Sequence, residues 1–553
     1  MSLRDKAAQL VIMPIYGEPE HRRSATFRRY EHYVRDLHVG GLIVTGHSLT
    51  SGIRNAEPYA MAALLNRLQK MSRTPLLVAA DFERGASMRV NATTPWPYNM
   101  AFAAAQDLDG VHDEAAETAR EARALGVNWI FAPVADVNNN PDNPIINIRS
   151  YGEDPLMVSK FVRSYILGAH SDKNNPVLVT AKHFPGHGDT ADDSHLGLAR
   201  IDADRQRIEA VELEPFRAAI ASGVDAVMTA HIAVPALEPE NEPATVSSNI
   251  LTGLLRGELG FRGIVVTDAM DMQGLAAMFP NGEAAVRAIQ AGNDVLLMPK
   301  KAEDVINAVV AAVQTGKITR RRLDESVARV LTAKAQLGLN RKRTVDLEAI
   351  ADMVDAPESE DRAQEVADHA VTLVYDQKDQ LPVRHPENAC LVTLSESRRS
   401  QEGLRLTDEV KKRVPGITTF ALDPSMSQAD LDQIREKTSN CGQIIVAAYV
   451  SVAAYRGNVA LAGLFPDFLN ALIAGKVPVT LASLGNPYLA RSFPNAAAYL
   501  TTFSPTPLSE AALAKALFGE IPITGRLPVS IPGVAKFGDG IQLPATHPAP
   551  KGP

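Results

Sequence analysis

Hydrophobic residues in the first 335 positions recur as short runs rich in β-branched residues, each followed by a polar loop and an amphipathic segment of helical length. This repeat is typical of βα units, in which parallel strands alternate with crossover helices. Eight such runs occur, at 10–15, 41–45, 76–81, 129–136, 178–183, 226–231, 264–268 and 295–298. Eight parallel strands alternating with helices predict an α/β fold that begins with a (β/α)8 barrel of the TIM type.

The segments between these runs have the length that crossover connections need. Helices are predicted at 58–71, 108–125, 155–170, 205–222, 249–259 and 301–315. These helices would return the chain to the start of each next strand, so their lengths and spacings fit the crossover connections of βα units.

A second α/β pattern begins near residue 361, after a stretch in which β-rich runs stop and charges cluster. We therefore predict a catalytic barrel at 1–336, a linker at 337–360 and a C-terminal domain at 361–553. The apolar runs of the second domain lie at 371–375, 390–394, 444–450, 477–484 and 498–502. Five runs are too few to close a barrel, so an open-sheet α/β/α sandwich is expected. The tail after Ile531, rich in proline and glycine, is expected to be an extended strap or a disordered end.

Composition narrows the class of protein. Hydrophobic residues make up 45% of the chain and charged residues 22%, which fits a globular protein and excludes a disordered, collagen-like or coiled-coil chain. No stretch approaches the ~18 uninterrupted apolar residues that a membrane-spanning helix needs. The net charge of -8, without a dominant basic run, disfavours a nucleic-acid partner. Nothing in the composition predicts an oligomeric state.

The cysteines and the start of the chain bear on the compartment. Two cysteines, Cys390 and Cys441, exclude a disulfide scaffold and a cysteine-ligated zinc cluster but leave one bridge in the C-terminal half open. Met1 leads directly into a helix-like start without a signal peptide. The chain as given is therefore expected to be cytoplasmic, or periplasmic or secreted if an export signal has been removed.

Several predicted strands end in a residue that can titrate. These residues are Asp81, Asp136, His183, His231 and Asp268. In a barrel of parallel strands such positions converge on the carboxyl-terminal mouth, where active sites form.

The segment KHFPGHGDTADDSH at 182–195 holds three of the thirteen histidines together with a lysine and three aspartates. A metal site is one interpretation, although no helical i, i+4 histidine pair or familiar ligand spacing occurs. A second is that His187 and Asp189 only fix the loop through hydrogen bonds. A third is acid–base chemistry at Asp193 and His195, in which the carboxylate orients the imidazole and stabilises its charged form.

The run at 264–268 delivers Asp268 to the barrel mouth. A carboxylate there can act as a nucleophile, a general base or a ligand. The alternative is that Asp268 caps the helix that follows.

Three segments together resemble glycoside hydrolase family 3: KHFPGHGDTADDSH, TDAM at 267–270, and NIRSYGEDP at 147–155. The Asp-Ser-His triplet after the PGHG turn resembles the β-N-acetylglucosaminidase branch and distinguishes it from the β-glucosidases of the family. GRLPV at 525–529 is similar to the C-terminal motif of the same family, so the resemblance extends into the second domain.

The resemblance implies a retaining double displacement without a metal or an organic cofactor. Asp268 matches the family nucleophile, His195 the general acid/base of the branch, and Asp193 the partner of that histidine. An imidazole has an unperturbed pKa of about 6.5, so it can donate and accept a proton near neutral pH with little tuning. Retaining glycosidases more often use a second carboxyl group for this purpose.

The resemblance also assigns six residues to sugar binding: Asp81, Arg149, Lys182, His183, His231 and Met298. Alternatives exist for several. Arg149 can instead pair with Glu153 or Asp154 within its own loop, one member of the adjacent pair Lys182 and His183 can be buried outside the site, and Met298 can be plain core. The chain departs from the family at 84–90, where RGASMRV replaces Gly-Gly-Arg-Val, so subsites beyond the terminal sugar are not assigned.

These observations favour an exo-acting β-N-acetylglucosaminidase that releases terminal GlcNAc from peptidoglycan-derived or related glycosides. A phosphorylase is an alternative, because a histidine lacks the permanent negative charge that repels phosphate. A β-glucosidase is disfavoured by the Asp-Ser-His triplet. A silent sugar-binding protein is disfavoured because a nucleophile and a proton donor together serve no purpose in a binder. The expected partner is a small carbohydrate.

Overall fold

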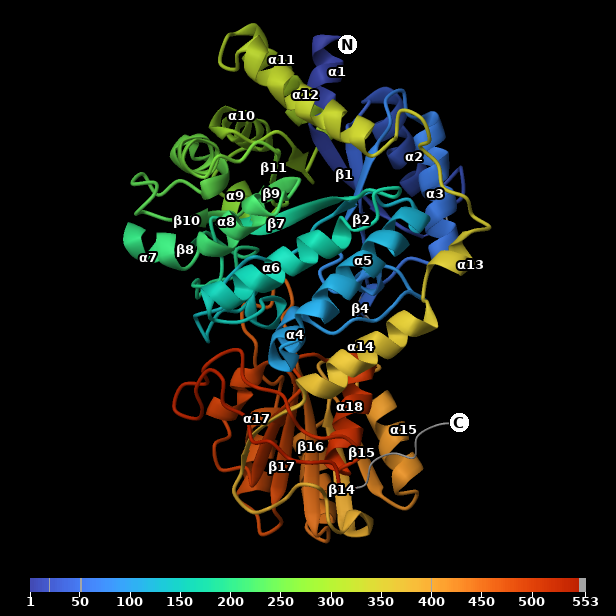
Figure 1. Ribbon diagram of the computed structural model, residues 1–553, viewed down its shortest axis with the longest axis vertical. Helices are drawn as coiled ribbons and strands as arrows, with labels where there is room; N and C mark the ends of the chain where they lie inside the picture. Colours follow the sequence, from blue (N-terminus) through green and yellow to red (C-terminus); the bar gives the residue numbers. More distant parts are fainter. Residues whose placement is uncertain (19, 50–51, 399, 547–553) are drawn as a thin grey trace.

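The computed structural model describes residues 1–18, 20–49, 52–398 and 400–546, which form two units stacked along the long axis of the molecule (Figure 1). The barrel and its helices occupy the upper part of the view. A sheet flanked by helices occupies the lower part, and helices α4 (Asn99–Ala105) and α14 (Pro357–Ala370) lie where the units meet.

Eight parallel strands form the barrel in the order β11-β9-β7-β6-β5-β2-β1-β12. A parallel bridge between Val266 and Val295 brings the first and last of these strands together. The bounds are β1 Val11–Tyr16, β2 Gly41–Thr45, β5 Leu77–Ala80, β6 Trp129–Ile130, β7 Leu178–Phe184, β9 Ala226–Thr229, β11 Ile264–Thr267 and β12 Leu296–Leu297. Each of the eight predicted runs overlaps one strand, so the predicted barrel is confirmed.

The apolar runs form barrel strands because both of their faces are covered. Every residue of β5, β7, β9 and β11 is buried. One face fills the barrel interior and the other packs beneath the helices. The helices have defined ends: the Asp107 carboxylate accepts a hydrogen bond from Gly110 N at the start of α5, and Gly126 ends it at a φ of 90°.

The other helices of the barrel unit are α1 Leu3–Ala8, α2 Ala25–Glu31, α3 Pro58–Met71, α5 Leu108–Leu125, α6 Pro155–Ala169, α7 Arg205–Ala210, α8 Glu214–Ala221, α9 Gln273–Ala276, α10 Asn281–Ala291, α11 Ala302–Gln314 and α12 Arg320–Gln336. A further helical segment with wider turns covers Asn249–Glu258. Short strands pair as β3 His47–Leu49 with β4 Gly52–Arg54, and as β8 Ala199–Arg200 with β10 Ile232–Ala233. Five of the six predicted barrel helices are confirmed within one residue.

The single helix predicted at 205–222 is wrong. The chain forms α7 and α8 with a break at 211–213. Pro215 has no N–H to donate to the carbonyl of Val211, so a continuous helix would lose a hydrogen bond there. The strand predicted at 129–136 is also shorter than expected and ends at Ile130. Phe131 N still donates to Ala80 O, but Pro133 has no N–H with which to continue the ladder.

The second unit is a six-stranded open sheet in the order β13-β18-β17-β16-β14-β15, parallel except for β13. Its strands are β13 Thr372–Asp376, β14 Ala389–Leu394, β15 Thr418–Leu422, β16 Gln443–Val450, β17 Val479–Gly485 and β18 Ala498–Thr501. Its helices are α15 Leu404–Arg413, α16 Gln428–Thr438, α17 Phe465–Ile473 and α18 Pro507–Leu517, and α13 Ile350–Met353 precedes α14. The predicted open α/β sheet is confirmed, but β15 was not predicted. It is an edge strand in which only Leu422 is buried, so it lacks an apolar run.

A disulfide and backbone hydrogen bonds hold segments of the second unit together. A disulfide joins Cys390 to Cys441. This is the bridge that the sequence analysis considered possible. Beyond Ile531 the chain forms an extended strap, in which Ile541 N donates to Leu373 O at 2.8 Å and Leu543 N donates to Ile523 O at 3.1 Å. Residues 547–553 of the predicted tail lie outside the described residues. Among the described helices, none is both long and apolar enough to cross a bilayer.

Candidate active site

The residues that the sequence placed at strand ends lie at the carboxyl-terminal mouth of the barrel. Asp81 follows β5, Lys182 and His183 belong to β7, and Asp268 follows β11. The segment after Asp268 contacts the loop of the predicted acid/base, since Gln273 N donates to the carbonyl oxygen of His195 at 3.4 Å. The predicted nucleophile and the predicted acid/base therefore belong to neighbouring segments of one mouth.

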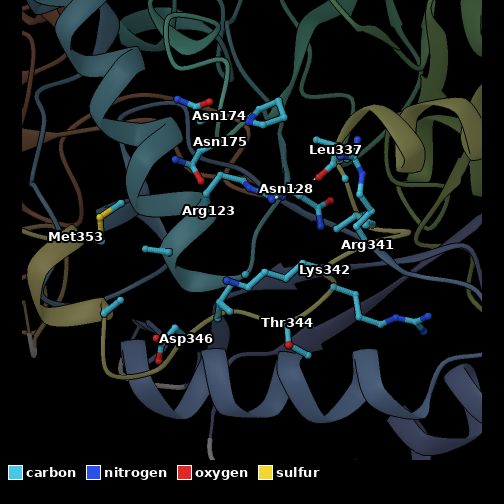
Figure 2. Close-up of a pocket in the computed structure, with 18 of the residues that line it drawn as sticks. Arg123, Asn128, Asn174, Asn175, Leu337, Arg341, Lys342, Thr344, Asp346 and Met353 are labelled. Carbon is cyan, nitrogen blue, oxygen red and sulfur yellow. Dashed lines mark hydrogen bonds between the residues drawn. The ribbon is translucent and has the colours of Figure 1, made fainter.

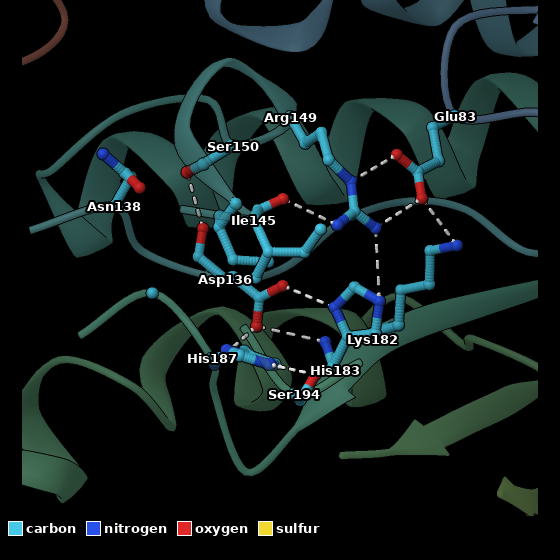
Figure 3. A network of polar contacts seen from close by, with 12 residues as sticks. Glu83, Asp136, Asn138, Ile145, Arg149, Ser150, Lys182, His183, His187 and Ser194 are labelled. Atoms are coloured by element: carbon cyan, nitrogen blue, oxygen red, sulfur yellow. Dashed lines mark hydrogen bonds and ion pairs between the residues drawn. The ribbon is translucent and has the colours of Figure 1, made fainter. Parts of the chain in front are cut away.

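A cluster of two carboxylates and two cations forms one wall of the mouth, and Figure 3 shows three of its members, Glu83, Arg149 and Lys182. The Lys182 ammonium lies 2.9 Å from Asp81 Oδ1 and 2.7 Å from Glu83 Oε1. Arg149 binds Glu83 with two hydrogen bonds, from Nε at 2.9 Å and from Nη2 at 2.8 Å. Burial favours a raised pKa for the Glu83 carboxyl, but the charges of Arg149 and Lys182 outweigh it and hold that pKa well below its ordinary value. Glu83 was not predicted as a site residue.

The alternative partners considered for Arg149 are wrong. The Glu153 carboxylate accepts hydrogen bonds from Ser530 N and Oγ in the second unit, at 2.7 and 2.6 Å. Asp154 caps α6 by accepting from Met157 N. Arg149 is therefore held by Glu83 at the site and not by its own loop.

His183 is held on the same wall by Asp136, which is completely buried. The His183 Nδ1 lies 2.7 Å from Asp136 Oδ2, and Nε2 lies 3.4 Å from the Arg149 Nη2. The alternative in which Lys182 or His183 is buried outside the site is wrong. The register between β7 and β9 shifts between Lys182 and Phe184, and both side chains contact residues of the mouth (Figure 3).

Asp193 and His195 form a hydrogen-bonded pair. His195 Nδ1 lies 2.8 Å from Asp193 Oδ1, which also accepts the backbone N–H of His195 at 2.9 Å. The Asp193 side chain is buried, whereas 21% of the His195 side chain is exposed. Burial favours a raised pKa for Asp193, but hydrogen bonds from His195 and from Tyr455 N lower it. The His195 imidazole is therefore accessible from the mouth, and the buried Asp193 carboxylate holds it in place.

Hydrogen bonds and close backbone packing fix the loop that carries this pair. Asn143 Nδ2 donates to the carbonyl oxygens of His187 at 2.9 Å and Gly188 at 3.0 Å. Gly188 approaches the backbone so closely that an added Cβ would lie 1.7 Å from Val137 O. His187 contacts Thr190 through Nδ1 and Ser194 through Nε2, each at 2.8 Å. These contacts match the interpretation of His187 as a residue that fixes the loop.

The buried His187 is expected to make the stability of the fold depend on pH. Burial lowers the pKa of His187 from 6.5 to about 4. The unfolded chain therefore binds a proton that the folded chain does not between these pH values, and the free energy of unfolding is expected to fall by about 1.4 kcal/mol per pH unit as pH decreases through this window. Urea titrations at several pH values, followed by the fluorescence of Trp96 and Trp129, measure the slope. The slope should decrease in His187→Gln, and an unchanged slope contradicts the assignment.

Asp268 lies half-buried after β11. Its Oδ1 accepts a hydrogen bond from Ala269 N at 2.7 Å. Burial favours a raised pKa, but the charges of His183, His231 and His195 outweigh it and lower the pKa of Asp268 to about 2. The capping alternative is wrong, because the next helix, α9, begins after Met272. Asp268 is therefore an ionised carboxylate that does not cap the helix after it.

The two remaining predicted binding residues, His231 and Met298, contact other residues of the barrel. His231 is buried, with Nδ1 2.7 Å from Thr245 Oγ1 and Nε2 3.0 Å from the Ala269 carbonyl oxygen. It thereby holds the backbone next to Asp268. Met298 is partly buried against the barrel core, and its N–H donates to Ile12 O at 2.9 Å.

The second unit reaches the site through a residue that was not predicted. From the sequence, the candidates of the second domain for reaching the barrel mouth are Asp423, Tyr449 and Arg456. Asp423 binds Ser425 in its own loop, and Tyr449 is buried in the second unit. Arg456 forms an ion pair with Glu396. The neighbouring Tyr455 instead contacts Asp193 and His195.

A cavity of about 560 Å³ lies at the opposite end of the barrel strands, near the carboxyl ends of α5 and α12 (Figure 2). Its polar lining includes Arg123, Asn128 and Lys342, and Arg123 Nη2 donates to Leu337 O at 3.5 Å. None of the described residues that line it is a histidine. Across the described part of the chain, no group of three or more His, Cys, Asp or Glu side chains has the arrangement of a metal site.

Residues 2–333 match the family description "Glycosyl hydrolase family 3 N terminal domain". The chain belongs to glycosyl hydrolase family 3. The family resemblance of its motifs is thereby confirmed, and its class is that of a glycoside hydrolase.

Relatives of this family 3 chain cover both units. It is 31% identical over 551 residues to a β-N-acetylglucosaminidase/β-glucosidase of Cellulomonas fimi, covering 95% of this chain and 93% of the relative. The structure of a family 3 β-N-acetylglucosaminidase from Paenibacillus sp. str. FPU-7 superposes with a TM-score of 0.85 at 32% identity, covering 96% of this chain and 99% of that one. A β-glucoside phosphorylase superposes with a TM-score of 0.84 at 25% identity, covering 96% and 94%.

Proposed function

We propose that this protein is a retaining exo-β-N-acetylglucosaminidase. The observation that carries the proposal is the pairing, at one mouth, of the ionised Asp268 with a hydrogen-bonded Asp193–His195 pair. The first supplies a nucleophile and the second a proton donor and acceptor, which are the two groups that a double displacement needs.

In the first step an Asp268 oxygen attacks the anomeric carbon and the glycosidic bond breaks. The proton of the His195 imidazolium passes to the departing oxygen, which leaves a covalent glycosyl ester and a neutral imidazole. In the second step His195 removes a proton from water as that water displaces Asp268. Asp193 orients the ring and stabilises its charged form in both steps.

The cluster of Asp81, Glu83, Arg149 and Lys182 supplies the sugar-binding wall. Because Glu83 fixes both cations, the Lys182 ammonium and the Asp81 carboxylate are held where sugar hydroxyls can be bound at low entropic cost. Asp136 holds His183 on the same wall. We assign these residues to the subsite of the terminal sugar, and peptidoglycan fragments with a terminal GlcNAc as the natural substrates.

The choice of GlcNAc is supported by the Asp-Ser-His triplet and by the names of the Cellulomonas fimi and Paenibacillus relatives. A phosphorylase is the second candidate function. It is favoured by the imidazole at the acid/base position, which does not repel phosphate as a carboxylate does, and by the likeness to a β-glucoside phosphorylase.

One experiment tests both candidates. The purified chain is assayed on the nitrophenyl β-glycosides of GlcNAc and of glucose over a series of phosphate concentrations, and NMR identifies the first-formed product. The expected result is β-GlcNAc, released faster than glucose. First-formed α-GlcNAc contradicts retention, GlcNAc 1-phosphate supports the phosphorylase, and faster release of glucose supports a β-glucosidase.

A further inference from the structure

A segment of the second unit crosses to the barrel mouth. It connects β16 to α17 and carries Tyr455, whose N–H donates to Asp193 Oδ2 at 3.0 Å. The Tyr455 ring lies edge-on against His195, with ring centroids 5.0 Å apart and an interplanar angle of 64°. One residue of the second unit therefore contacts both members of the acid/base pair.

Contacts within the second unit hold this segment in place. The Glu396 carboxylate accepts from Ser451 N at 2.9 Å and from Ser451 Oγ at 2.6 Å, and it pairs with Arg456. The φ of Tyr455 is 66°, a conformation that side chains other than glycine rarely adopt. An L residue in this conformation is retained only where its surroundings fix it, which is what the contacts on both sides of Tyr455 do.

The two contacts with the pair have separate effects. The Tyr455 N–H occupies Asp193 Oδ2, which leaves Oδ1 to bind His195 Nδ1. The ring restricts rotation of the imidazole, because an edge-on aromatic contact favours one orientation of its partner.

The ring also faces open space at the site. The exposed fraction of Tyr455 is 58%, although its backbone is held against the barrel. In a double displacement the acid lies beside the departing oxygen, so a ring that contacts His195 lies on the side of the leaving group. An exposed aromatic ring in that place offers an apolar face to a sugar.

We infer that Tyr455 is a positioning residue for the acid/base pair and a contact for the sugar that leaves, so that the second unit completes an active site carried by the barrel. This inference rests on the proposed function of His195.

The test uses Tyr455→Gly and Tyr455→Phe in the full chain. Glycine keeps the N–H and accepts a φ of 66° but removes the ring, and phenylalanine keeps the ring. Two substrates are compared by kcat/KM: N,N′-diacetylchitobiose, whose leaving group is a sugar that needs a proton, and the β-fluoride of GlcNAc, whose leaving group is small and needs little protonation. We expect Tyr455→Gly to lower kcat/KM for chitobiose roughly tenfold, with little change for the fluoride and little change for Tyr455→Phe on either substrate.

The matched control is Tyr59→Ala, an exposed tyrosine on α3, which should change neither value. If the role of Tyr455 were purely structural, kcat/KM would fall by the same factor for chitobiose and for the fluoride. An equal fall on both substrates in Tyr455→Gly therefore overturns the inference. Unchanged chitobiose cleavage in Tyr455→Gly also overturns it, while leaving the proposed function intact. Failure of the proposed function is recognised separately, because His195→Ala would then show no dependence on the leaving group.

Discussion

Asp268→Ala is expected to lower kcat/KM on GlcNAc glycosides by roughly 10⁴-fold or more, as removal of a covalent nucleophile does in other enzymes. A pKa of about 2 keeps Asp268 ionised at any pH at which the enzyme is assayed, so the whole population is ready to attack. The loss should be the same for every leaving group, because attack on the anomeric carbon is common to all substrates. Steady-state kinetics on the nitrophenyl glycoside and on chitobiose measure it.

Azide rescue distinguishes a lost nucleophile from a damaged fold. In Asp268→Gly, azide can occupy the space of the missing carboxylate and attack the anomeric carbon of an activated substrate. The leaving group departs and the α-glycosyl azide forms, with inverted configuration. The variant should keep the thermal midpoint of the parent within a few degrees. A loss of less than about a hundredfold, far below the expected loss of roughly 10⁴-fold, contradicts the assignment.

The barrel could be predicted because its strands are buried on both faces and therefore read as continuous apolar runs. Prediction from apolar runs fails for a strand with little buried surface, and prediction from helical periodicity fails where a proline interrupts the backbone hydrogen bonds. β15 is an edge strand with little buried surface, so its sequence resembles a loop. The break between α7 and α8 follows from Pro215, a signal that was present in the sequence and outweighed by helical periodicity.

Parts of the site could be predicted because parallel strands deliver their last residues to one mouth. Glu83 was missed, although the buried Lys182 and the partly buried Arg149 need more negative charge nearby than Asp81 supplies. Tyr455 had no local signal. It lies 262 residues from Asp193 in the chain, and the contact depends on how the two units pack.

His195→Ala is expected to act selectively, in contrast to Asp268→Ala. For chitobiose, kcat/KM should fall roughly 10²–10⁴-fold, the usual contribution of general acid catalysis. For the dinitrophenyl glycoside of GlcNAc it should change little, because that leaving group departs without a proton. Its kcat should fall, since water then lacks a base, and azide should restore kcat while forming the β-glycosyl azide. Equal losses in kcat/KM on both substrates contradict His195 as the acid.

Asp193→Asn tests the pair rather than the imidazole alone. An asparagine has one oxygen in place of two, so it can still accept from His195 Nδ1, but its NH2 group then faces Tyr455 N and that contact is lost. It also no longer stabilises an imidazolium by charge. The variant should therefore show the leaving-group pattern of His195→Ala with a smaller loss on chitobiose. A loss that is the same for chitobiose and the dinitrophenyl glycoside would mean that Asp193 only supports the loop, because a distorted loop impairs attack by Asp268 and protonation alike.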